Sequence, residues 1–127
     1  MAREPRVICA SADLAEAGKG VRFSLAREGG EEKGFAVRHA GKVRGYVNRC
    51  PHMGTELDWQ PGDFFEASGL YLACATHGAL FEPSTGLCVA GPCRGASLQP
   101  LQVRERDGQV YLDDDPPSNT MRKRAAT

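Results

Sequence analysis

Short stretches of apolar residues recur along the chain, some of them alternating with polar ones, and predict β-strands. In the clearest alternation, Val21-Arg-Phe-Ser-Leu25, every second side chain is apolar, as in a strand with one buried face. The other stretches are bounded by Gly, Pro, Asn or charged residues, many of which favour turns. We therefore expect strands over residues 6–10, 21–25, 35–37, 43–47, 69–73, 79–81, 87–89, 101–104 and 109–112.

Turn-forming residues between these stretches predict how the strands connect. Ala40-Gly41 and Asp107-Gly108 each lie between two strands, as at the tips of β-hairpins. Charged residues 28–34 predict a turn, and residues 11–17 predict one helical turn or a loop. Many short strands with little helix indicate an all-β protein, with antiparallel sheets in a sandwich or barrel-like arrangement.

Length and composition limit the other possibilities. The chain has 127 residues, which favours one domain, here over residues 1–112; residues 113–127 lack apolar periodicity and predict a disordered tail. With 16 basic and 16 acidic residues the chain has no basic excess, so nucleic-acid binding is not expected. The chain contains no run of about 18 apolar residues, so a membrane span is not expected. The apolar stretch near the N-terminus is too short for a signal peptide, so we expect a cytoplasmic protein.

The charges are unevenly distributed along the chain. Residues 1–49 contain ten basic and six acidic side chains, whereas residues 50–99 contain one basic and five acidic ones. The acidic stretch is either an ordinary solvated face or a surface that steers a basic redox partner.

Two short segments of similar composition contain most of the candidate metal ligands. The first, Cys50-Pro-His52-Met-Gly54, and the second, Cys74-Ala-Thr-His77-Gly78, each offer a thiolate and an imidazole and end in glycine. We call them knuckle one and knuckle two. Twenty-one residues lie between His52 and Cys74. In the reducing cytoplasm, cysteines grouped with histidines indicate a metal site more often than a disulfide.

The order of ligands within each knuckle bears on the metal. Zinc fingers usually place two Cys in one knuckle and two His in the other, so zinc fits this order poorly. A Cys and a His in both knuckles suits a two-iron cluster in which one iron has Cys ligands and the other has His ligands.

Residues 48–99 resemble the Rieske ferredoxins and Rieske domains. Besides the two knuckles, the resemblance includes Phe81, Thr85-Gly86 and the Gly91-Pro92 pair, which in that family lies in a third loop over the cluster. The resemblance implies one [2Fe-2S] cluster per chain, bound in a small subdomain of about residues 48–96. Cys50 and Cys74 would bind the inner iron, and His52 and His77 the outer, solvent-edge iron.

The resemblance also implies a function. The chain would carry single electrons from a reductase, commonly a flavoprotein, to an acceptor such as a ring-hydroxylating oxygenase, without catalysing a reaction itself. Two alternatives remain open: a small Rieske-like subunit of a larger oxidoreductase of the nitrite-reductase type, and an iron- or redox-sensing module. His39 is the only other histidine, so a mononuclear iron site with two His and one carboxylate is not expected.

Four positions differ from the Rieske proteins of respiratory complexes. Those proteins carry an additional disulfide between the knuckles, where this chain has Thr55 and Thr76 (or Ala75), and two hydroxyl donors, where it has Ala79 and Phe81. With fewer donors to the cluster sulfurs, the reduced state is less stable. We expect a reduction potential at the low end of the Rieske range of about −150 to +300 mV.

The remaining cysteines and aromatic residues allow more than one interpretation. Buried free thiols are expected at Cys88 and Cys93, with spare ligands or a disulfide as alternatives, and Cys9 is expected in the core. Trp59, Phe64 and Phe65 are expected to pack beneath the knuckles, with partner docking as the alternative.

Overall fold

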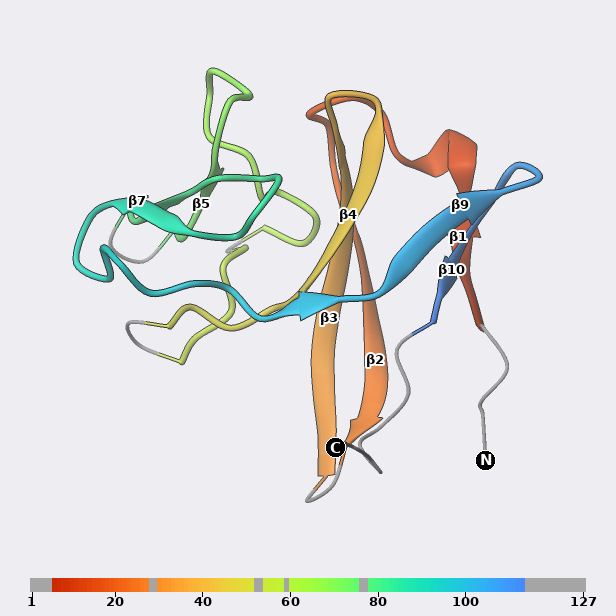
Figure 1. Cartoon of the computed structure of the whole chain (residues 1–127), viewed down its shortest axis with the longest axis horizontal. Helices are drawn as coiled ribbons and strands as arrows, with labels where there is room; N and C mark the ends of the chain where they lie inside the picture. The colour runs from red at the N-terminus through yellow and green to blue at the C-terminus, as the bar shows by residue number, and fades with distance from the viewer. Residues whose placement is uncertain (1–5, 28–29, 52–53, 59, 76–77, 114–127) are drawn as a thin grey trace.

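Ten strands in three antiparallel sheets make up the described part of the chain (Figure 1). The computed structural model describes residues 6–27, 30–51, 54–58, 60–75 and 78–113; the expected tail lies outside these residues, except for Asp113. The elements are β1 Arg6–Ala10, the 3-10 helix η1 Ser11–Asp13, β2 Val21–Arg27, β3 Gly30–His39, β4 Lys42–Val47, β5 Leu72–Ala73, β6 Leu80–Phe81, β7 Cys88–Ala90, β8 Pro100–Leu101, β9 Val103–Arg106 and β10 Gln109–Leu112.

The largest sheet has the strand order β2-β3-β4-β8. Its β3–β4 hairpin turns at Ala40 and Gly41, whose φ angles of +54° and +77° match a two-residue turn of the type that follows the twist of antiparallel strands. The sheet ends at β8, which pairs with β4 only after the chain has passed through both knuckles. The Val47 amide donates to the Gln99 carbonyl at 2.9 Å, so the two ends of residues 48–98 lie side by side.

A second sheet, with the order β1-β10-β9, packs against the first. Leu25, Val47, Leu101 and Leu112 form one buried cluster between them, and Leu14, Ala36 and Val110 form another. The sheets approach closely at Gly45, where an added Cβ would lie 2.7 Å from a methyl carbon of Val103. We call these two sheets the base.

The third sheet, β5-β6-β7, lies on the opposite side of β4 from the β1-β10-β9 sheet (Figure 1). Its strands are only two or three residues long. A separate core lies between this sheet and the β3–β4 hairpin, and it contains the four cysteines of this region. We call residues 48–99 the cluster region.

The structure confirms the all-β prediction and most of the strands. The predicted turn over residues 28–34 is wrong from Gly30 onward, because β3 begins there and its residues 30–36 pair with β2. The predicted strand over residues 101–104 is divided at Gln102, because β8 pairs with β4 whereas β9 pairs with β10. Among the described residues there is no helix with the length and apolar character needed to cross a membrane.

Candidate metal centre

The two knuckles are closed by the same pair of backbone hydrogen bonds. In knuckle one, the Cys50 amide donates to the Thr55 carbonyl and the Gly54 amide donates to the Cys50 carbonyl, both at 2.7 Å. In knuckle two, the Cys74 amide donates to the Ala79 carbonyl and the Gly78 amide to the Cys74 carbonyl, both at 2.9 Å. The two turns therefore have one construction, although their histidines lie at different positions after the cysteine.

The glycine that ends each knuckle is required by the backbone conformation. Gly54 and Gly78 have φ angles of +77° and +72°, a region that side-chain-bearing residues rarely adopt. An added Cβ would meet nothing within 4 Å at either position, so close packing is not the reason for glycine. The strained turn brings the chain back to donate to the cysteine carbonyl.

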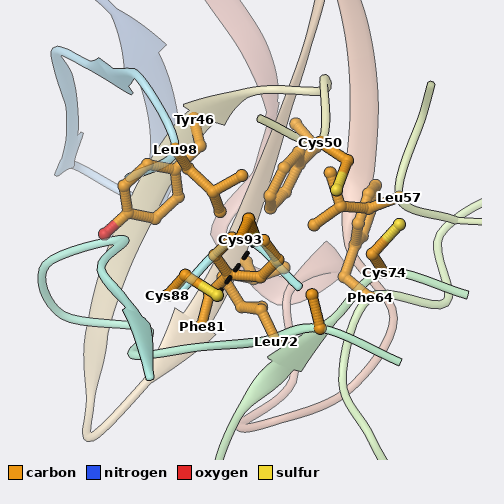
Figure 2. Packing of buried hydrophobic residues seen from close by; sticks show 13 residues of the cluster. Tyr46, Cys50, Leu57, Phe64, Leu72, Cys74, Phe81, Cys88, Cys93 and Leu98 are labelled. Atoms are coloured by element: carbon orange, nitrogen blue, oxygen red, sulfur yellow. Dashed lines mark hydrogen bonds between the residues drawn. The ribbon is translucent and has the colours of Figure 1, made fainter. Parts of the chain in front are cut away.

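Both knuckle cysteines are buried, with 1% of their surface exposed, and both belong to the core of the cluster region (Figure 2). The Ala75 amide donates to the Leu57 carbonyl at 3.0 Å, which joins knuckle two to the segment just after knuckle one. His52 and His77 lie outside the described residues, so their role as ligands stays a prediction. Two buried thiols in matched turns fit the inner half of a cluster with mixed Cys and His ligands.

A buried polar pair fixes the chain on both sides of knuckle one. The Asn48 amide group donates to Asp58 at 3.0 Å, and its carbonyl oxygen accepts from the Leu57 amide at 2.8 Å. The second carboxylate oxygen of Asp58 accepts from the Gly62 amide at 2.9 Å and lies 3.5 Å from Nε of Arg22. This pair could not be found from the sequence, because two polar residues ten positions apart in a loop show no periodic pattern.

Aromatic side chains join the knuckles to the base. Phe64 is fully buried and stacks on Phe35 of β3, with ring centroids 3.9 Å apart and an angle of 12° between the planes. Phe64 therefore has the predicted core role, and the half-buried Phe65 packs beside the same core. The buried hydroxyl of Tyr46 donates to the Pro83 carbonyl at 2.7 Å. Trp59 lies outside the described residues.

The third loop packs on knuckle two. Gly91 has a φ of +99°, and an added Cβ would lie 2.8 Å from the Cα of Ala79, so only glycine lets the loop approach this closely. Ala79 and Phe81 are themselves fully buried, and neither supplies a hydroxyl group to this core.

Cys88 and Cys93 are buried free thiols, as predicted. Burial, together with hydrogen bonds to Cys88 and Cys50, raises the pKa of the Cys93 thiol to about 12. The contact of Cys93 with Cys50 was not predicted from the sequence. The position of Cys93 directly after Gly91-Pro92 was the one feature that could have suggested it. Among the described residues, no three or more His, Cys, Asp or Glu side chains are arranged to hold a metal ion.

Most acidic side chains of the cluster region have partners within the chain. Glu56 accepts from Arg22 at 2.9 Å, Asp58 is buried as described, and Glu82 accepts from the Ser84 hydroxyl at 3.0 Å. A hydrogen bond from the Ser68 hydroxyl, together with bonds from the backbone amides of a turn, lowers the pKa of Glu66. Hydrogen bonds of this kind leave the carboxylates charged, so the steering of a basic redox partner by the acidic stretch stays a prediction.

Cys9 and His39, the remaining cysteine and histidine of the described residues, both have packing roles. Cys9 is half-buried against the core of the base, and burial is the main cause of its raised pKa. The ring of His39 stacks on Phe65, with centroids 6.2 Å apart.

Two curated proteins are similar in sequence to this chain. Oxidoreductase NdmD of Pseudomonas putida is 30% identical over 89 residues, which are 65% of this chain and 14% of that protein. Cytochrome b6-f complex iron-sulfur subunit 2 of Nostoc sp. is 31% identical over 107 residues, which are 83% of this chain and 55% of that protein. The chain therefore spans about one seventh of the first protein and about half of the second.

Solved structures share the fold. The ferredoxin of Sphingomonas yanoikuyae B1 superposes with a TM-score of 0.70 at 23% identity, covering 88% of this chain and all of that one. A chain in the complex of reduced oxygenase and oxidized ferredoxin in carbazole 1,9a-dioxygenase superposes with a TM-score of 0.65 at 22% identity, covering 87% of this chain and 94% of that one. The pattern that defines the Rieske [2Fe-2S] domain matches residues 4–111.

Proposed function

The chain belongs to the Rieske [2Fe-2S] domain family and carries its [2Fe-2S] cluster, and we propose that it is a one-electron carrier rather than an enzyme. When bound, the cluster accepts and releases one electron at a time. Cys50 and Cys74 hold the inner iron in this proposal, and His52 and His77 the outer iron. The observation that carries the proposal is the matched closure of the two knuckles around buried cysteines.

The residues around the knuckles serve to keep the cysteines in place and water away from them. The Asn48–Asp58 pair fixes the chain before and after knuckle one, and Gly91 seats the third loop on Ala79. The stacked pair of Phe35 and Phe64 anchors the whole arrangement to β3. A rigid surrounding of this kind suits electron transfer, because the protein then rearranges little when the charge of the cluster changes.

The proposed partners are redox proteins: a flavin-dependent reductase as donor, and a terminal oxygenase or a similar protein as acceptor. The structural likeness to a ferredoxin found in complex with an oxygenase supports this choice of acceptor. A cytoplasmic location belongs to the same proposal, since Cys88 and Cys93 are free thiols.

We further propose that the reduction potential lies at the low end of the Rieske range. Ala79 and Phe81 place no hydroxyl near the knuckles, and the hydroxyl of Tyr46 is already donated to Pro83. With fewer donors to cluster sulfurs, the more negative reduced state is stabilised less. A clearly positive potential by voltammetry at neutral pH would contradict this part of the proposal.

The experiment that tests the main proposal is the spectroscopy of the purified protein. We expect a brown protein with two irons per chain and, after reduction by one electron, the rhombic EPR signal of a His-ligated cluster. Cys50→Ser is expected to lose this signal, whereas the matched control Cys9→Ser, at a thiol outside the cluster region, is expected to keep it. A colourless protein with one bound zinc would overturn the proposal.

A second candidate is a fixed electron-transfer module within a larger oxidoreductase. It is favoured by the match to NdmD, in which the similar segment is a small part of a much longer protein. The two candidates differ in how the chain behaves with its partners. Co-purification in a fixed ratio with an oxidoreductase subunit favours the module, and repeated one-electron turnover as a free protein with a reductase favours the carrier.

A further inference from the structure

Two of the three cysteines that the proposed cluster does not use lie next to each other. Cys88 begins β7, and Cys93 lies in the turn that follows this strand. The Sγ of Cys93 donates a hydrogen bond to the Sγ of Cys88 across 3.0 Å, the dashed line in Figure 2. In a disulfide the two sulfurs are about 2.05 Å apart, so a movement of roughly 1 Å would join them.

The backbone holds the two cysteines in this arrangement. The Cys88 amide donates to the Ala96 carbonyl at 2.8 Å, and the Ala96 amide donates to the Cys93 carbonyl at 2.9 Å. Both cysteines are therefore hydrogen-bonded through their backbone to Ala96, and these bonds close the turn between them. The thiol of Cys88 also donates to the Ala90 carbonyl at 3.2 Å, which directs its sulfur toward the inside of the turn.

The turn between the cysteines is the exposed part of this loop. Pro92, Arg94 and Gly95 are exposed, although Cys93 itself is 7% exposed. The bonds from Arg94 to Gly91 and from Gly95 to Cys88 are 3.3 Å long, beyond the usual range for N–H···O bonds. A local opening of this turn would expose Cys93 without disturbing the sheets. The next residue, the exposed Arg94, carries a positive charge that suits an anionic oxidant.

We propose that Cys88 and Cys93 are a dithiol–disulfide pair that a low-molecular-weight disulfide such as glutathione disulfide oxidises. In the opened turn, where Cys93 is no longer buried, its thiol loses a proton and the thiolate attacks one glutathione sulfur. The glutathione S–S bond breaks, and one glutathione leaves with the proton given up by Cys93. The thiolate of Cys88 then attacks the Cys93 sulfur, and the second glutathione leaves as a thiol. Two electrons and two protons pass from the pair to glutathione disulfide, and one S–S bond joins the cysteines.

The disulfide would fix the loop that covers knuckle two. Gly91, which packs on Ala79, lies between the two bridged residues, so the bridge would restrict the turn that carries it. The pair does not require the cluster to be an electron carrier, and it uses none of the four proposed ligands, although Cys93 also hydrogen-bonds to Cys50. The dithiol–disulfide proposal can therefore fail while the proposed electron-carrier function holds. Equally, the carrier function can fail while the disulfide still forms.

The test uses the full-length protein with its cluster, incubated with glutathione disulfide and then alkylated. We expect peptide mass spectrometry without reduction to find a Cys88–Cys93 link, formed over minutes to hours, while the cluster absorbance is retained. Dithiothreitol should restore both thiols. Cys88→Ala and Cys93→Ala should each abolish the link, and the matched control Cys9→Ser should leave it in place.

Three results would overturn the proposal, and all of them come from the wild-type protein, so none depends on a variant that folds. The first is no link at an oxidant concentration that glutathionylates Cys9. The second is a link that joins Cys88 or Cys93 to Cys50 or Cys74 instead. The third is a Cys88–Cys93 link that forms only after the cluster absorbance has been lost, which would make it a product of unfolding.

Discussion

The base and the cluster region are held together by different means. In the base, β2 and β3 pair over seven positions, and hydrophobic clusters lie between two sheets. In the cluster region the strands have two or three residues, too few for a stable sheet of their own. Turn hydrogen bonds, a buried polar pair and the stacking of Phe64 on Phe35 replace the long ladders there. This difference predicts that the base folds from its own strands, whereas the cluster region depends on its anchors and its metal.

Removing the cluster should produce the largest difference between the two regions, measured as the protection of their amides from exchange. With iron chelated under reducing conditions, we expect the amides of Cys50, Cys74 and Gly78 to exchange with solvent about 100-fold faster or more, because metal binding and folding are coupled in such loops. The amides between β2 and β3 should change little. Hydrogen-exchange mass spectrometry measures both, and equal loss of protection in both regions would show that they form one cooperative unit.

The aromatic stack is the main apolar anchor between the two regions. Phe64→Ala removes a fully buried ring from its place against Phe35, and we expect a loss of about 3–5 kcal/mol in the free energy of unfolding. The half-buried neighbour provides the control, since Phe65→Ala should cost only about 1–2 kcal/mol. Urea denaturation of the iron-loaded proteins measures both. Equal losses would mean that the stack is not the anchor.

The buried polar pair should have the next largest effect. Asp58→Ala leaves the Asn48 side chain and the Gly62 amide without their buried acceptor, so we expect a loss of about 2–4 kcal/mol. Iron content after purification should fall too, because knuckle one loses its support. The control is the exposed Asp63→Ala, expected within about 0.5 kcal/mol of the wild type. A stable, fully loaded Asp58→Ala protein would refute the role assigned to the pair.

The smallest effect is expected in the base, at an ion pair on its surface. Arg38 donates to both carboxylate oxygens of Glu105, at 3.0 and 2.6 Å, and this interaction lowers the pKa of Glu105 from 4.5 to about 2. The pair should therefore stabilise the fold fully above about pH 4.5, and this contribution should be lost as the pH falls toward 2.

A double-mutant cycle with Arg38→Gln and Glu105→Gln measures this contribution without the other bonds of Arg38. Because both side chains are partly exposed, we expect a coupling energy of only about 0.5–1 kcal/mol at pH 7 and a smaller one at pH 3.5. A coupling energy that does not change with pH would show that the charge of Glu105 is not its source.

The sequence predicted local features well and long-range ones poorly. The hairpin tips at Ala40-Gly41 and Asp107-Gly108 were found because a positive φ leaves a clear residue signature. The start of β3 was missed because Glu and Gly favour strands weakly, and pairing with β2 overrides that preference. The change of sheet at Gln102 has no local signal, since only the partners of the two strands differ.

The same division applies to the candidate metal centre. The knuckles could be recognised from residue types and spacing, and the closing glycines were visible in the sequence. The support of Asp58 for Asn48 and the contact of Cys93 with Cys50 could not be read from the sequence. Both depend on how loops fold back, which neither periodicity nor composition records.

The hydrogen bond between Val47 and Gln99 makes the cluster region an insertion whose two ends meet on the base. The free-energy cost of closing such a loop, which comes from lost chain entropy, rises only with the logarithm of the loop length. Each doubling adds about 0.6 kcal/mol. Added residues at the exposed turn of Ala67 and Ser68 would thus cost the base little. An insertion at this turn would therefore enlarge the surface offered to a partner while the base keeps its strands.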